Sequence, residues 1–163
     1  LATLPIIVSL LLIGCGKVEE KAPWPGHIRN ISGFSESEKA KIQSAIDALN
    51  EKAGEEIVSE SEHDSNFSVE IQKTSAASWP QSRAGFATVK STDCKIEISD
   101  ALFTNSKTDY LYPVVWHEIG HCAGLGHSNE DGAIMSPTTS VVGSYPSNII
   151  GKFIENIREA AGI

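Results

Sequence analysis

The sequence predicts one α+β domain, on the basis of its length, its composition and the order of its helical and strand patterns. Of its 163 residues, 40% are hydrophobic and 21% are charged, which is typical of a soluble globular protein. A strand pattern, a helix, several short strands and two further helices follow one another along the chain. No internal repeat or low-complexity block interrupts that order. We therefore assign residues 27–163 to a single folded domain.

The first helix has the clearest boundaries. Ser35 and Glu38 form a capping-box pattern, in which each side chain can satisfy a backbone donor at a helix start. Gly54 favours an abrupt end, because glycine tolerates the left-handed backbone that such an end needs. The pattern predicts a helix over 36–53. Its expected buried face carries apolar residues at helical spacing, namely Ile42, Ala45, Ile46 and Leu49.

The remaining elements are shorter. Apolar residues that alternate with polar ones, or follow one another in short runs, predict strands over 27–32, 56–61, 67–74, 84–90 and 95–99. A largely apolar helix is predicted over 110–123, after a loop over 74–83. A third helix is predicted near the C-terminus, where apolar residues at helical spacing form one face, namely Ile149, Ile150, Phe153, Ile154 and Ile157.

Residues 1–14 are uncharged and almost wholly apolar, which suits the core of a signal peptide and is too short for a membrane-spanning helix. We expect the printed sequence to begin inside such a signal. Cys15 follows directly, and this junction resembles the lipobox of bacterial lipoproteins, in which the cysteine is lipidated. An ordinary secretory signal is the alternative. Residues 15–26 are then expected to be the lipidated cysteine and a polar tether.

These features predict an exported bacterial lipoprotein that faces the periplasm or the cell exterior and touches the membrane only through its lipid anchor. The formal charge of −8 argues against nucleic acid or an anionic membrane surface as a partner. In an oxidising compartment Cys94 and Cys122 can form a disulfide bond, and two buried free thiols are the alternative.

The residues that carry chemistry lie in the pattern H-E-x-x-H-x-x-G-x-x-H over 117–127. His117 and His121 are one helical turn apart, so they project from the same face and can share one tetrahedral ion. Gly124 allows the helix to end sharply, so that His127 can return as a third ligand. Three histidine nitrogens leave the fourth position of Zn²⁺ open for water, as in catalytic sites. Glu118 lies beside them, placed to take a proton from that water.

This motif and the single methionine, Met135, together resemble the metzincin clan, in which the zinc motif precedes a Met-turn. The chain is most similar to the matrixins, which carry serine directly after the third histidine, as Ser128 does, and a Met-x-Pro turn, matched by Met135 and Pro137. The resemblance implies a mixed twisted sheet with an antiparallel edge strand, a zinc-site helix, the Met-turn and a C-terminal helix. It also implies a zinc endopeptidase with one catalytic Zn²⁺, Glu118 as general base and Met135 beneath the metal.

By the same resemblance, a monomeric enzyme binds its peptide or protein substrate extended along the strand at 84–89, and residues 137–140 border the pocket for the side chain after the cleaved bond. Thr139 stands where matrixins carry a tyrosine, so the shape of that pocket does not carry over. No histidines between 74 and 94 match a second, structural zinc, and calcium binding is left open. Pro137 occupies the position of the tyrosine ligand of astacin-like enzymes, so we expect no such ligand.

Two alternatives share this scaffold. One is a catalytically inactive zinc-binding or interaction lipoprotein, for which the altered Thr139 position is the support and the retained Glu118 is the objection. The other is a hydrolase of cell-wall peptides, whose zinc chemistry is the same and whose substrate alone differs. Two further histidines, His27 and His63, have no partner at ligand spacing and are expected at the surface.

Overall fold

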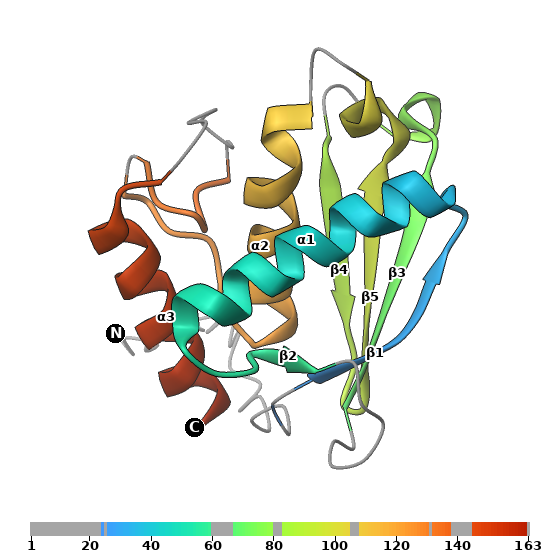
Figure 1. Ribbon diagram of the computed structural model, residues 1–163. Coiled ribbons are helices and arrows are strands. Elements are labelled where there is room, and N and C mark those ends of the chain that lie inside the picture. Colours follow the sequence, from blue (N-terminus) through green and yellow to red (C-terminus); the bar gives the residue numbers. More distant parts are fainter. Residues whose placement is uncertain are drawn as a thin grey trace, which may run out of the picture.

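The computed structural model describes residues 24, 26–59, 67–79, 83–104, 108–130, 132–137 and 145–162. A five-stranded sheet with the order β2-β1-β3-β5-β4 forms one side of the molecule (Figure 1). Its strands are β1 (Gly26–Ser32), β2 (Val58–Ser59), β3 (Ser68–Thr74), β4 (Gly85–Val89) and β5 (Asp93–Ser99). All neighbours pair in parallel except β4, which is antiparallel to β5 at the edge. The predicted mixed α+β fold with an antiparallel edge strand is confirmed.

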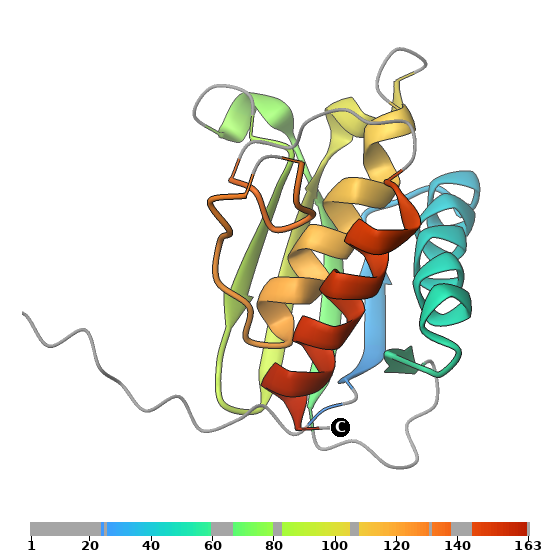
Figure 2. The ribbon, with the colours of Figure 1, turned by 90° about the vertical axis from the view of Figure 1, so that its left-hand side faces the viewer.

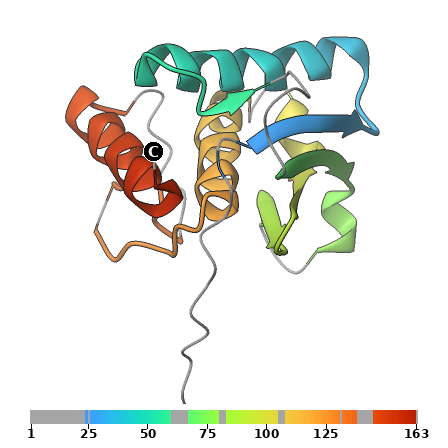
Figure 3. The same cartoon turned by 90° about the horizontal axis from the view of Figure 1, so that it is seen from below.

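Only one face of the sheet is strongly apolar. On the two central strands Val69, Ile71, Ile96 and Ile98 are almost completely buried, and polar residues such as Glu70 and Lys95 alternate with them. Two helices, α1 (Glu36–Ala53) and α2 (Leu111–Cys122), cover this face (Figure 3). The period-two pattern of the strands therefore decides which side of the sheet receives the helices.

Helix α1 has the predicted bounds and the predicted buried face. Ser35 and Glu38 form the capping box, and Gly54 ends the helix with a φ of 71°. Past that end, the Asn50 side chain accepts from the backbone N–H groups of Ile57 and Val58 and donates to the carbonyl of Val58. The Asn50 amide thus pairs with backbone groups at the start of β2, as a neighbouring strand would, and joins β2 to the helix.

Helix α2 lies between the sheet and the C-terminal helix α3 (Ser147–Ala161), as Figure 2 shows. Nearly all of its residues are buried, which explains the largely apolar sequence. Trp116 donates from Nε1 to the carbonyl oxygen of Ala45 in α1 at 2.7 Å. At the C-terminal end of α2, Cys122 is disulfide-bonded to Cys94 of β5. The helix is therefore fixed to both α1 and the sheet.

Several boundaries differ from the predictions. Trp24 and Gly26 had been assigned to the tether, but Trp24 is buried against Phe67, with ring centroids 5.9 Å apart, and Gly26 begins β1. The physical reason is that burying the large apolar surface of an indole is more favourable than leaving it exposed to solvent. The described parts of the loops hold three 3₁₀ helices that were not predicted, at Ala76–Ser78, Asp100–Phe103 and Thr108–Tyr110.

Other predictions fall outside the described residues: the signal at 1–14, Cys15, most of the tether, His63, the end of the strand expected over 56–61, and residues 138–140. Within the described ranges, no helix is both long enough and apolar enough to cross a membrane.

Candidate metal centre

The three histidines of the motif come from one helix and the loop that follows it. His117 and His121 lie on the same face of α2, one turn apart. The helix ends at Cys122, and two residues later Gly124 has a left-handed φ of 96°. The N–H groups of Gly124 and Leu125 donate to the carbonyls of His121 and Gly120. This closed turn reverses the chain and brings His127 towards α2. The sequence predicted that Gly124 would allow this reversal.

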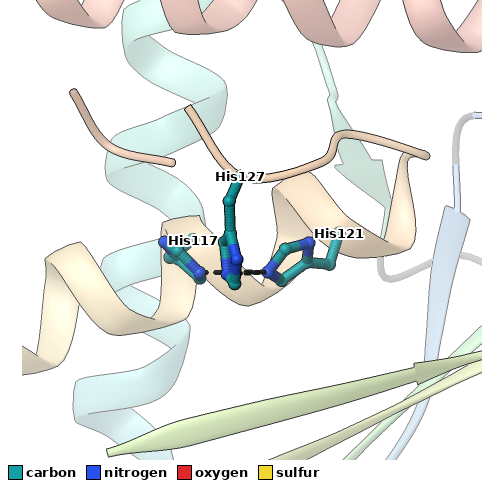
Figure 4. Close-up of side chains that lie close together, drawn as sticks. All are labelled: His117, His121 and His127. Carbon is teal, nitrogen blue, oxygen red and sulfur yellow. Dashed lines mark hydrogen bonds between the residues drawn. The ribbon is translucent and has the colours of Figure 1, made fainter. Parts of the chain in front are cut away.

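The ring nitrogens of the three histidines converge on one point (Figure 4). Nε2 of His121 lies 3.0 Å from Nε2 of His117 and 3.2 Å from Nε2 of His127. Zinc binds histidine nitrogen at about 2.0–2.1 Å, so two nitrogens of a tetrahedral site are roughly 3.3 Å apart. The spacing therefore suits three ligands of one zinc ion. Among the described residues these three histidines are the only such cluster.

Backbone carbonyls fix the orientation of two of the rings. Nδ1 of His117 donates to the carbonyl oxygen of Ile134 at 2.7 Å, and Nδ1 of His121 donates to that of Leu125 at 2.8 Å. A carbonyl only accepts, so Nδ1 carries the hydrogen and Nε2 presents a lone pair. Lone pairs that face each other at 3.0 Å repel unless a cation lies between them. The donor set thus fits a metal ion.

Burial keeps the rings of His117 and His121 neutral, and a histidine must be neutral to bind a metal. Desolvation lowers the pKa of His117 to about 4, and the nearby His121 and His127 lower it further, against the effect of the Ile134 hydrogen bond. Burial also lowers the pKa of His121. At neutral pH both rings are therefore ready to bind a metal without first losing a proton.

Glu118 is almost completely buried, with 5% of its surface exposed, where α2 packs on β4. Burial raises its pKa to about 8, while a hydrogen bond from the backbone of Ala87 and the charge of Arg83 oppose that rise. Within the described part of the chain, its Oε2 atom has no hydrogen-bond partner. At neutral pH this carboxyl group is therefore largely protonated in the metal-free chain, and the positive charge of a metal ion at the three histidines would lower its pKa and favour the carboxylate that accepts a proton.

Met135 lies under the zinc helix. It is 5% exposed, and its sulfur approaches α2 at Gly120, where an added Cβ would lie only 2.5 Å from Sδ. Phe153 of α3 approaches the same glycine, 2.9 Å from that hypothetical Cβ. Glycine costs about 1 kcal/mol relative to alanine inside a helix, so Gly120, inside the motif, is a sequence signal of close packing. No sequence pattern marks the backbone carbonyl of Ile134 as the partner of His117.

The matrixin family matches residues 32–157 of this chain. The chain belongs to the matrixin family. It is therefore a zinc metallopeptidase, and the predicted relationship is confirmed. The family match contains every residue of the metal centre, and it extends from the last residue of β1 through the other strands and most of α3.

A solved structure supports the fold of this matrixin. The archaemetzincin of Methanopyrus kandleri matches with a TM-score of 0.51 and 12% sequence identity, over 82% of this chain and 95% of that chain. At this identity the likeness concerns the fold alone. No curated protein sequence matches this matrixin.

Proposed function

We propose that this matrixin is an endopeptidase that uses one zinc ion, held by Nε2 of His117, His121 and His127. The observation that carries the proposal is the convergence of three histidine Nε2 atoms beside a buried carboxyl group. Three histidine ligands leave one position of a tetrahedral ion for water or substrate, whereas a structural site has four protein ligands.

In the proposed mechanism the chain supplies ligands, a base and a binding strand. Zinc at this site supplies Lewis-acid chemistry, which lowers the pKa of water and polarises the carbonyl of the scissile bond. Glu118 takes the proton of the attacking water and hands it to the leaving amine. Its Oε2, which has no hydrogen-bond partner among the described residues, is the atom available for that proton. The carbonyls of Ile134 and Leu125 keep two ligand rings oriented throughout the cycle.

The substrate would lie extended along β4, the last strand of the sheet among the described elements. The carbonyl of Ala84 and the N–H of Lys90 bond to β5. Backbone groups alternate in direction along a strand, so Gly85, Ala87 and Val89 direct theirs to the opposite edge. That edge adjoins Glu118, which Ala87 contacts. Strand addition there would deliver a peptide bond to the base.

We also propose that the protein is exported and lipidated at Cys15, and acts as a monomer on peptides or proteins outside the cytoplasm. The lipobox-like sequence supports this, and the disulfide bond between Cys94 and Cys122 suits an oxidising compartment. Incorporation of labelled fatty acid into the full chain, and its loss in Cys15→Ala, would test the anchor. Equal labelling of both proteins would contradict it.

The endopeptidase proposal is tested by incubating the zinc-loaded protein with a mixed-sequence peptide library and reading the products by mass spectrometry. We expect internal cleavage by the wild type, none by Glu118→Ala, and equal zinc content in both. Absence of cleavage by folded, zinc-loaded wild type would reject a general endopeptidase. A parallel trial with cell-wall peptides then separates a specialised hydrolase from a binding protein.

A further inference from the structure

The edge strand β4 approaches the zinc-site helix α2 closely at Gly85. A Cβ atom added there would lie 2.5 Å from Oε1 and 2.9 Å from Cγ of Glu118, and 2.8 Å from Cγ1 of Val114. All three distances are shorter than real Cβ contacts, so a side chain at this position forces something to move. The backbone of Gly85 is not left-handed, so space alone, and not backbone strain, distinguishes glycine from alanine here.

The residue that would move is Glu118. Val114 is 2% exposed and β-branched, so it has one strongly preferred rotamer in a helix and little room to turn. Glu118 has three rotatable bonds, and the atom closest to the added Cβ lies at the end of its side chain. A methyl group at position 85 would therefore push the carboxyl group away from β4.

The next residue on the same face of β4 also contacts this carboxyl group. Ala87 follows Gly85 by two positions, and its backbone hydrogen-bonds to Glu118. The strand that we propose to bind the substrate thus also positions the base. Gly85 leaves space for the Glu118 side chain, and the backbone of Ala87 hydrogen-bonds to it. Any displacement of Glu118 from β4 changes its position relative to a peptide bound on that strand.

We propose that Gly85 is a positioning residue, whose lack of a side chain sets Glu118 against the edge strand at the distance that proton transfer needs. The inference rests on the proposed role of Glu118 as general base. It requires that Gly85→Ala reduces turnover while substrate binding and zinc binding remain, because neither the strand's backbone groups nor the three histidines are altered.

The kinetic test compares the zinc-loaded wild type with Gly85→Ala. A displacement of about 1 Å in a reacting group can cost on the order of 100-fold in rate, so we expect a fall of that size in kcat with little change in KM. Gly151→Ala in α3 is the matched control, since an added Cβ there meets no atom within 4 Å, and it should behave as the wild type. A kcat of Gly85→Ala equal to wild type, or a fall explained by lost zinc, would overturn the inference.

A second measurement does not depend on activity. In the metal-free protein, Gly85→Ala should lower the melting temperature more when Glu118 is present than in a Glu118→Ala background, because the second change removes the contacted atoms. Equal decreases would show that the two residues do not meet. Val114→Ala, combined with Gly85→Ala, removes the other close contact and keeps the comparison possible if the single variant folds poorly.

The outcomes separate the two proposals. A wild type that cleaves no peptide rejects the endopeptidase and the positioning role together. A wild type that cleaves, beside a Gly85→Ala variant that cleaves equally fast, rejects the positioning role alone.

Discussion

Nδ1 of His117 lies 2.7 Å from the carbonyl oxygen of Ile134, so the residue that precedes Met135 orients the first predicted zinc ligand. The carbonyl of Met135 itself accepts from the N–H of Ser128, the residue after the third histidine, at 2.8 Å. The Met-turn is thus joined by hydrogen bonds to the start and the end of the zinc motif. Its methionine side chain, packed at Gly120, keeps that turn in place.

Truncating the Met135 side chain should weaken both hydrogen bonds of the Met-turn, the one to His117 and the one to Ser128. We expect Met135→Ala to lower the free energy of unfolding by about 2–5 kcal/mol, the usual cost of removing a large buried side chain. We also expect zinc affinity to fall roughly 10–100-fold, as it does when partners of metal ligands are lost. Urea unfolding and competition with a zinc chelator measure the two effects. Met135→Leu should retain most of both, and unchanged zinc affinity in Met135→Ala would refute the coupling.

Zinc itself should stabilise the folded chain, because the three nitrogens meet only in the native state. We expect added zinc to raise the melting temperature of the wild type, and to raise that of His127→Ala much less. His27→Ala is the matched control, since His27 lies on β1 and outside the ligand cluster. The two variants are compared by thermal unfolding with and without zinc. An undiminished zinc response in His127→Ala would remove His127 from the ligand set.

Glu38 makes stability depend on pH at the start of α1. Hydrogen bonds from Lys73, 2.8 Å away, and from the backbone of Ser35 hold the pKa of this carboxyl group below 4.5, its ordinary value. A depressed pKa stabilises the folded state above the unfolded pKa, and this stabilisation disappears as the pH falls through the folded pKa. We expect the free energy of unfolding of the wild type to exceed that of Glu38→Gln by roughly 1 kcal/mol at pH 7, and this difference to shrink as the pH falls through the folded pKa. A difference independent of pH would show that the charge of Glu38 contributes nothing.

The elements that the sequence predicted best are those with local determinants. Helix α1 begins and ends as expected because Ser35, Glu38 and Gly54 act within one turn of their own positions. The three histidines could also be assigned locally, since two share a helix face and the third follows a glycine turn. Local spacing therefore predicted the centre of the site.

What the sequence did not reveal depends on contacts between distant segments. The bond from Lys73 to Glu38 joins residues 35 positions apart, and the close approach of Gly85 to Glu118 depends on how β4 packs on α2. Neither contact leaves a periodic pattern in the amino-acid sequence. Trp24 was misplaced for the same reason, because its partner Phe67 lies just before β3, far along the chain. These contacts are decided by packing, which a single sequence does not display.

The disulfide bond between Cys94 and Cys122 is a further long-range contact, and it constrains the zinc helix directly. It joins β5 to the last residue of α2, next to the ligand His121, and both cysteines are fully buried. A cross-link over a sequence separation of 28 residues restricts the unfolded chain and is worth about 3.5 kcal/mol in the chain-entropy account. We expect reduction of the metal-free wild type to lower its free energy of unfolding in urea by an amount of this order. The paired variant Cys94→Ala, Cys122→Ala should be as unstable as the reduced wild type and should not respond to reductant. A wild type whose unfolding midpoint is the same with and without reductant would mean that the two thiols are free in solution.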